Sequence, residues 1–579
     1  MPSGRGYSRA RSRARTRAFA GAVSVAALAA VVVALLVVTG PSGGGAKPAG
    51  ARLTSTTVKT AARSSRGAAP LSTTTRPHSS PRRTFLGPYG IESAAIIAEN
   101  NRPGTTSWEI SAASSPGYIE GFANVTYAQP GAKVRLYVST TAPSYRVIAY
   151  RMGWYHGKGG REVWQSGSLP GHVQPPCPVA PVTNMVSCTN WSFSTTVVIG
   201  GSWAQGDYLF KLVGSGGQQS YIILTVWDPA IHGAYLVMTR SLTEQAWNPY
   251  GGYDLYQGEG PCPPGSSTYP PCNRARVVSF DRPYGWGHGA ADFLDNEYPF
   301  VQWAERHGLD VSYATDITVS EHPGLLLTHK ALLSLDHDEV WTNSERIAAL
   351  TAAASGVNMV FFGAAPVLRH ARLQPSAFGP DREEVDYRDS AEDPLDGKVS
   401  PYQVTGNTWS SPPTDWDEEM FVGEMYSGYV LPGAPSAALA PYDASSWLFA
   451  GTGLRKGSTV PDVIASDIDH LDPDGPMPAN LQVLAHSPVL LAHVYTNQGQ
   501  WGGYTYSDMT YYTAKEGSGV FDSGTVNWLT ALVTCTAQAC PATALGRITG
   551  NLLSAFGRGP AGRLHPSVAN WQSVTPPGS

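Results

Sequence analysis

Two side chains with complementary proton chemistry stand close together in the middle of the chain. His337 and Glu339 are separated by one residue in the acidic stretch 336–339. In an extended segment, residues at this spacing project to the same side of the backbone. An imidazole and a carboxylate side by side can bind a metal ion or act as a general acid and base pair. We therefore take His337 and Glu339 as the candidate catalytic residues.

The same acidic stretch also has a purely structural interpretation. Asp336 and Asp338 precede a predicted helix, and carboxylates are favoured near the positive N-terminus of a helix. Spacing alone does not separate this interpretation from the catalytic one. Outside the low-complexity N-terminal part, the chain has no G-x-S-x-G, H-E-x-x-H or P-loop motif, so the common hydrolase and nucleotide signatures are absent.

The flanking elements predict where this stretch lies in the fold. Residues 331–335 and 357–362 are apolar runs that are long enough for buried strands and too short for helices. A helix between them makes the unit strand, helix, strand, so the two strands should be parallel. In an open α/β sheet, ligands bind at the carboxyl ends of such strands. The stretch 336–339 begins at that edge.

The helix between the two strands carries signals at both ends. Thr342 and Glu345 form a capping box at its start, and Gly356 is placed where a left-handed C-terminal residue is needed. Four residues recur at helical spacing and predict one face of this helix: Ile347, Leu350, Thr351 and Ala354.

Length and composition limit the class of protein. The chain has 579 residues, which predicts two or three domains. Charged residues make up only 15%, and Gly (62) and Pro (46) are abundant, which indicates a loop-rich and β-rich protein. The formal net charge is −4 and no domain-wide basic face is visible. Nucleic acid is therefore not an expected partner.

The cysteines indicate the compartment. They form three local pairs along the chain: Cys177 and Cys188, Cys262 and Cys272, and Cys535 and Cys540. An even number without a C-x-x-C motif predicts local disulfides, and hence an oxidising compartment. Six buried free thiols are the alternative. With all six paired, no cysteine remains as a nucleophile.

The N-terminal region indicates export. Residues 1–17 are rich in arginine and form a basic cytoplasmic segment, and residues 18–38 are uncharged. As a helix, the uncharged run would reach roughly 30 Å, enough to cross a bilayer. Its length favours a transmembrane signal anchor in the cytoplasmic membrane over a cleaved signal peptide. Residues 39–86 are low in large apolar residues and predict a disordered linker.

Two folded domains and a tail are expected after the linker. Period-two alternation in short β-branched runs predicts a β-sandwich over residues 87–229. Alternating strand and helix signals predict an α/β domain with a parallel sheet over residues 230–545. Residues 546–579 are expected to be a tail.

Six sequence segments follow one another in a fixed order: IEGFA (119–123), YRMGWYHGKGGR (150–161), QAWNPYGGYDLY (245–256), SFDRPY (279–284), DHDEVW (336–341) and GVNMVFFGA (356–364). In these segments the chain resembles the C-terminal region of the N,N-dimethylformamidase large (beta) subunit family, over roughly residues 92–533. The resemblance implies a β-sandwich followed by a parallel-sheet domain similar to glutamine-amidotransferase-like folds, without a cysteine nucleophile.

The resemblance also implies a cofactor. The characterised enzyme is similar to a mononuclear-iron amidohydrolase whose iron is held by two tyrosines and a glutamate, with a histidine two residues before the glutamate. This pattern falls on His337 and Glu339, which makes Glu339 the implied metal ligand and His337 its proton-handling neighbour. Trp247 stands where one tyrosine is expected. Tyr208 is placed as the second tyrosine by approximate spacing.

Further positions follow from the same resemblance. Tyr250, Tyr256 and Tyr284 are nearby tyrosines that could substitute as ligands. Ala365 replaces an asparagine of the family pattern, and Asp467 falls on a further acidic position. An iron ion held in this way would polarise an amide carbonyl and activate water.

We therefore expect an exported, hydrolase-like protein that cleaves the C–N bond of small linear amides with a metal. A non-catalytic cell-envelope protein, in which the β-sandwich binds carbohydrate or protein, is the main alternative. A hydrolase without a metal, using His337 as the base, is a third hypothesis. The sequence does not predict an oligomeric state.

Overall fold

The computed structural model describes residues 83–110, 118–262, 266, 270–472, 474–496, 503–534 and 541–574. The predicted anchor 18–38 and the cysteines Cys535 and Cys540 lie outside the described residues. Within the described ranges, no helix combines the length and the apolar character that a bilayer crossing requires.

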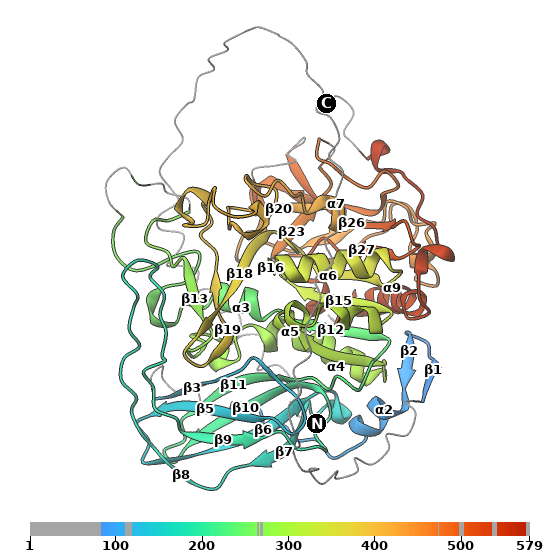
Figure 1. Ribbon diagram of the computed structural model, residues 1–579. Helices are drawn as coiled ribbons and strands as arrows, with labels where there is room; N and C mark the ends of the chain where they lie inside the picture. The colour runs from blue at the N-terminus through green and yellow to red at the C-terminus, as the bar shows by residue number, and fades with distance from the viewer. Residues whose placement is uncertain are drawn as a thin grey trace, which may run out of the picture. The chain divides into compact units, whose positions relative to one another are not determined.

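Two sheets form from the first part of the chain (Figure 1). The smaller has the order β3 (Ile119–Ala123), β5 (Lys133–Thr140), β9 (Thr195–Val198). The larger has the order β4 (Tyr127–Ala128), β11 (Gln219–Val226), β10 (Gly206–Gly214), β6 (Ser144–Met152), β7 (Gly160–Gln165), and β8 (Leu169–Pro170) pairs with β6. Apolar and polar side chains alternate along β5, so one face of the strand packs in the core. Val134 and Leu136 are buried in a shared core, whereas Lys133 and Arg135 are exposed.

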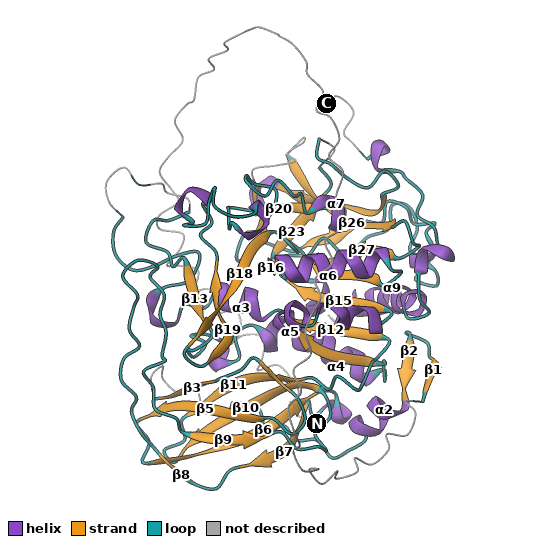
Figure 2. Ribbon diagram, viewed as in Figure 1, coloured by secondary structure: helices purple, strands orange, loops and turns teal. Residues whose placement is uncertain are grey.

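A seven-stranded sheet forms the centre of the second part (Figure 2). Its order is β14 (Val311–Thr315), β12 (Tyr235–Thr239), β15 (Ala331–Asp336), β17 (Asn358–Gly363), β27 (Gly519–Asp522), β26 (Tyr504–Thr513), β24 (Gln482–Leu490). The strands from β14 to β27 pair in parallel, as predicted. The strands β26 and β24 are added antiparallel, which makes the sheet mixed.

Helices cover both faces of this sheet. Leu333 of β15 belongs to a core with helices α4 (Tyr298–Arg306), α8 (Trp528–Val533) and α9 (Pro541–Phe556). The neighbouring Leu332 belongs to a second core, with α5 (Asp316–Glu321) and α6 (Asn343–Ala354). Successive residues of a strand point to opposite faces, so one apolar run serves two helical layers.

Further elements surround these sheets. A four-stranded sheet has the order β13 (Val277–Ser279), β19 (Gly379–Val385), β18 (Arg369–Ser376), β16 (Val340–Thr342). Shorter pieces are β1 (Thr84–Leu86), β2 (Ile91–Ser93), α2 (Ala94–Asn100), α3 (Ser241–Ala246), α7 (Glu419–Val422), β20 (Met425–Val430), β21 (Ala437–Leu439), β22 (Val460–Ile464), β23 (Asp467–His470) and β25 (Val494–Thr496).

The predicted unit of strand, helix and strand is present as β15, α6 and β17. The capping box forms as expected: the backbone N–H of Glu345 donates to the hydroxyl of Thr342 at 3.1 Å, and the N–H of Thr342 donates to the Glu345 carboxylate at 3.3 Å. Gly356 has a φ of +92°, the left-handed conformation that its position after α6 requires.

The predicted face of α6 is wrong. Ile347 is 48% exposed, and Thr351 and Ala354 are also exposed. The face that packs on the sheet consists instead of Ala348, Ala349, Ala352 and Ala353. Alanine side chains allow the helix to lie close to the strands, so small size rather than hydrophobicity decides which face is buried.

The region 546–579, expected to be a tail, contributes to the core. Helix α9 runs through the predicted boundary at residue 546 and buries Leu545, Ile548, Leu552, Leu553 and Phe556. These residues recur at helical spacing, and they fill the same core as β15 and β17.

Two predicted disulfides are confirmed, Cys177–Cys188 and Cys262–Cys272. No free cysteine occurs among the described residues. The architecture agrees with the predicted class, an α/β part combined with an all-β part. The correspondence to a glutamine-amidotransferase-like fold stays a prediction.

Candidate functional site

The structure brings His337 and Glu339 together at the carboxyl edge of the central sheet. Strand β15 ends at Asp336, and residues 337–339 cross the edge before β16 begins. The His337 Nε2 atom lies 3.3 Å from the Glu339 Oε2 atom. The Glu339 side chain is 4% exposed and the His337 side chain 17% exposed, so a ligand can reach the imidazole.

A sharp backbone turn makes this arrangement possible. Asp336 has a φ of +61°, which is unusual for a residue other than glycine. Its carbonyl oxygen lies against Gly363 of the neighbouring strand β17, where a Cβ atom would approach to 1.5 Å. Glycine at position 363 therefore gives the chain room to turn just before the site.

Three hydrogen-bond donors contact the Glu339 carboxylate. Arg369 Nε donates to Oε1 at 3.0 Å. Trp247 Nε1 and the Tyr256 hydroxyl both donate to Oε2, at 3.0 and 2.5 Å. Burial raises the pKa of Glu339, but His337, Arg369 and the bond from Tyr256 outweigh it and lower the pKa to about 2. Glu339 is therefore an anion at neutral pH.

The two aromatic donors are positioned by one loop. Helix α3 ends at Trp247, and the backbone N–H of Leu255 donates to the Ala246 carbonyl at 2.9 Å, which folds the loop back onto the helix. The rings of Trp247 and Tyr256 then stack with centroids 3.5 Å apart and planes 11° apart. The guanidinium of Arg388 lies 4.3 Å from the centroid of the Tyr256 ring and adds positive charge.

A second acid faces His337. Asp467 begins β23 and shares a hydrogen bond with Tyr426 of β20. Burial raises the pKa of Asp467, Glu339 raises it further, and His337 opposes both. The imidazole thus interacts with two carboxyl groups from different parts of the chain.

The tyrosines considered from the sequence are scattered. Tyr208 lies in the core of the two N-terminal sheets, where its hydroxyl donates to the Ala204 carbonyl at 2.5 Å and its ring stacks on Trp203. The prediction from approximate spacing that Tyr208 is a metal ligand together with Glu339 is therefore wrong. Tyr250 donates to Glu120 at 2.9 Å. Tyr256 is the tyrosine that contacts Glu339.

Other parts of the site had no signal in the sequence. Arg369 follows a glycine- and alanine-rich loop without a recognisable motif, and it comes to Glu339 because β18 pairs in parallel with β16. The backbone N–H of Ala365 donates to Asp469 at 2.8 Å and not to Glu339.

The comparison with known families covers this site. The family described as "N,N-dimethylformamidase beta subunit-like, C-terminal" matches residues 146–541, more than half of the chain. The chain belongs to this family. The matched range includes His337, Glu339 and all the groups that contact them. None of the curated proteins compared with the chain matches it.

The residues of this dimethylformamidase-like site do not fit the iron ion that the family resemblance implies. Both Glu339 oxygens already accept donors, and the indole nitrogen of Trp247 donates a proton and has no lone pair for a metal. The Arg369 cation lies against Oε1, where it would repel a metal ion.

Proposed function

We propose that this dimethylformamidase-like protein is an exported hydrolase that cleaves the C–N bond of small linear amides, with His337 and Glu339 as its proton-transfer pair. The observation that carries the proposal is the 3.3 Å contact between a partly exposed imidazole and a buried anionic carboxylate. Family membership supports the choice of amides as substrates.

The chemistry requires one base and one acid, and an imidazole serves as both. With His337 Nε2 donating to Glu339, Nδ1 is left to accept a proton from water as the water attacks the amide carbonyl. The Glu339 anion stabilises the imidazolium that forms. The imidazolium then gives the proton to the leaving nitrogen as the C–N bond breaks. The products are a carboxylic acid and an amine.

Two finer points belong to the same proposal. The N-terminal sheets are proposed to be a β-sandwich and the second part a glutamine-amidotransferase-like domain, supported by the parallel strands from β14 to β27. Export is part of the same proposal, and the two disulfides support an extracytoplasmic location because they are typical of oxidising compartments.

The test is amine release from formamides and other short amides by the full-length protein. His337→Gln is expected to lower kcat by about 100-fold or more, the usual contribution of a general base. His486→Gln is the matched control, because His486 also contacts a carboxylate, Asp508, at 2.6 Å, outside the site. Its kcat should stay within about twofold of the wild-type value. Equal rates in the wild type and His337→Gln would overturn the proposal.

A second candidate function is ligand binding without turnover. It is favoured by the hydrogen bonds that Glu339 accepts. Its carboxylate oxygens contact Arg369, Trp247 and Tyr256. Calorimetry with the same amides distinguishes the two candidates. Binding of an amide without release of amine would favour this second function.

A further inference from the structure

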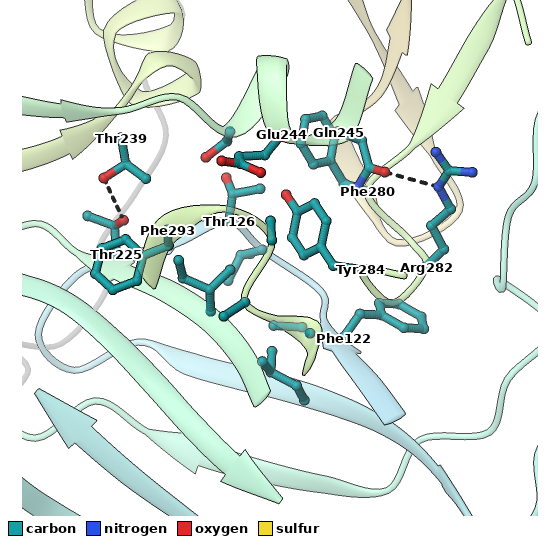
Figure 3. A pocket seen from close by; sticks show the side chains of 18 of the residues that line it. Phe122, Thr126, Thr225, Thr239, Glu244, Gln245, Phe280, Arg282, Tyr284 and Phe293 are labelled. Carbon is teal, nitrogen blue, oxygen red and sulfur yellow. Dashed lines mark hydrogen bonds between the residues drawn. The ribbon is translucent and has the colours of Figure 1, made fainter. Parts of the chain in front are cut away.

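A cavity separate from the His337–Glu339 site lies between the N-terminal sheets and helix α3 (Figure 3). The space between its walls amounts to about 600 Å³ when the adjoining open solvent is included, so this figure is not an enclosed volume. Its walls come from β3, β11, α3 and the loops that follow β13. We call it the Tyr284 cavity. None of the residues that contact Glu339 lines it.

Three of the sequence segments that mark the family meet in this cavity. Phe122 comes from IEGFA, Gln245 from QAWNPYGGYDLY, and Tyr284 from SFDRPY. Phe122 and Gln245 are 123 positions apart and Gln245 and Tyr284 are 39 positions apart, and the fold brings all three to one space. This convergence indicates that the cavity is a regular part of the fold.

The lining has an apolar part and a polar part. Phe122 and Phe293 are apolar residues of the lining, on opposite sides of the cavity in the view of Figure 3. In Figure 3 the hydroxyls of Thr126 and Tyr284 point toward the carboxylate of Glu244. Among the described residues, no group hydrogen-bonds to the Tyr284 hydroxyl, although the Glu244 charge is the strongest one acting on it. An unpartnered hydroxyl beside a carboxylate leaves hydrogen-bonding capacity for a ligand.

Glu244 also has capacity to spare. Arg240 Nη2 lies 2.8 Å from Oε1, and the backbone N–H of Asp292 donates to Oε2 at 3.1 Å. Each carboxylate oxygen has two lone pairs, so each can accept one more donor. The Glu244 side chain is 6% exposed, which makes any such contact a desolvated one.

The charges around the cavity favour a cation. The guanidinium of Arg240 is shared among three carboxylates: Glu244 at 2.8 Å, Asp336 at 2.6 Å and Glu297 at 3.4 Å. Burial raises the pKa of both Glu244 and Glu297, and the charge of Arg240 offsets this rise only in part.

The two arginines that line the cavity already donate to protein groups. Arg282 donates to the Gln245 amide oxygen at 3.0 Å and to backbone carbonyls of the 248–253 loop. Arg382 donates to Asp281 at 2.8 Å and to two further backbone carbonyls. An anionic ligand would meet Glu244 and Glu297 without a free cation to balance it.

We propose that the Tyr284 cavity binds a small organic amine in its protonated form. The ammonium group would donate to Glu244 and to the Tyr284 hydroxyl, and its alkyl or aryl part would pack against Phe122 and Phe293. Aromatic walls beside a carboxylate suit an organic cation better than a neutral or anionic molecule of the same size. The inference rests on this cavity alone and does not depend on hydrolysis at His337.

Helix α3 connects this cavity to the candidate site. Glu244 and Gln245 line the cavity, whereas Trp247, which caps the C-terminal end of the same helix, donates to Glu339. The Thr243 hydroxyl accepts a bond from the Val340 backbone at 3.0 Å, next to Glu339. An amine bound at Glu244 is therefore one helical turn from a group that holds the catalytic carboxylate.

Calorimetry with the full-length protein and benzylammonium tests the proposal. Benzyl alcohol and benzoate are the neutral and anionic probes of the same shape. Benzylammonium is expected to bind at least about tenfold more tightly than benzyl alcohol, since hydrogen bonds from a charged group add stabilisation. Benzoate is expected not to bind. Equal binding of the three probes, or no binding of benzylammonium, would overturn the proposal.

Two variants locate the binding. Tyr284→Phe removes one hydroxyl and should weaken benzylammonium binding by about fivefold. Tyr250→Phe is the matched control, since its hydroxyl donates to Glu120 and lies outside the cavity lining. Glu244→Gln should weaken binding more strongly. If Glu244→Gln fails to fold, the Tyr284→Phe variant tests the site, provided that its melting temperature is unchanged. Wild-type affinity of Tyr284→Phe for benzylammonium would contradict the assigned site.

Discussion

At the scale of single residues, the protein keeps the buried Glu339 carboxylate ionised. Burial opposes the charge on Glu339, and three donors together with an adjacent imidazole overcome this opposition. The Glu339 charge is stabilised by these protein contacts rather than by water. The same contacts occupy both carboxylate oxygens, so Glu339 has the surroundings of a general-base partner.

The ionisation of Glu339 predicts how stability depends on pH. Its folded-state pKa is about 2, below the ordinary value of 4.5, so its stabilising contribution is complete above pH 4.5 and is lost as the pH falls toward 2. Glu339→Gln should therefore lower the free energy of unfolding at pH 6, and this loss should shrink by about 2 kcal/mol between pH 6 and pH 3. Urea denaturation at pH 6 and pH 3 measures both values.

Glu516→Gln serves as the control for this prediction, because Glu516 is exposed in a turn before β27. Its effect on the free energy of unfolding should be small and similar at both pH values. A Glu339→Gln penalty that is the same at pH 6 and pH 3 would show that Glu339 is not held as an anion.

At the scale of elements, helix α6 is held by its small side chains. Ala349 and Ala352 are fully buried against the sheet, while Ile347 on the other face is 48% exposed. A helix that lies this close to strands has no space for larger groups on its inner face. Its position matters for function because β16, which follows Glu339 directly, leads into α6.

Two substitutions on α6 should therefore have opposite outcomes. Ala349→Leu overpacks the interface and is expected to lower the free energy of unfolding by about 1–3 kcal/mol. Ile347→Ala removes an apolar side chain on the solvent-facing side of the helix. It should therefore lower the free energy of unfolding by less than about 0.5 kcal/mol. Chemical denaturation of the two variants decides, and a larger cost for Ile347→Ala would reverse the assignment of the buried face.

How much could be predicted from sequence depended on how local each feature is. The pairing of His337 with Glu339 and the capping box of α6 involve residues two and three positions apart, and both were predicted. Tyr256 and Trp247 contact Glu339 across 83 and 92 positions, so only the tertiary fold could reveal these contacts. Tyr208 was placed by spacing, but strand pairing with β6 and β11 puts it in a different core.

At the scale of the whole described unit, a buried ion pair joins the N-terminal sheets to the α/β part. Arg151 of β6 and Glu305 of α4 meet at 2.5 Å, and both side chains are 0% exposed. Tyr313 and Asn100 each donate to the same carboxylate at 2.8 Å. Arg151, which lies in the sequence YRMGWYHGKGGR, thus has a structural role at this junction.

Removing one partner of this pair should be costly. Glu305→Ala leaves a buried arginine without a counter-charge and is expected to lower the free energy of unfolding by about 3–5 kcal/mol. The double variant Arg151→Met with Glu305→Met removes both charges and should recover a large part of that loss. A double-mutant cycle by urea denaturation measures it. Additive losses in the double variant would contradict a coupled pair.

We propose that His337 and Glu339 cleave amides without a metal bound at Glu339. The most direct measurement is the rate of amine release from a short formamide by the full-length protein, before and after prolonged treatment with an iron chelator. The account predicts that the chelator leaves the rate unchanged and that His337→Gln lowers it by about 100-fold or more. Loss of activity with the chelator, restored by added iron, would contradict it.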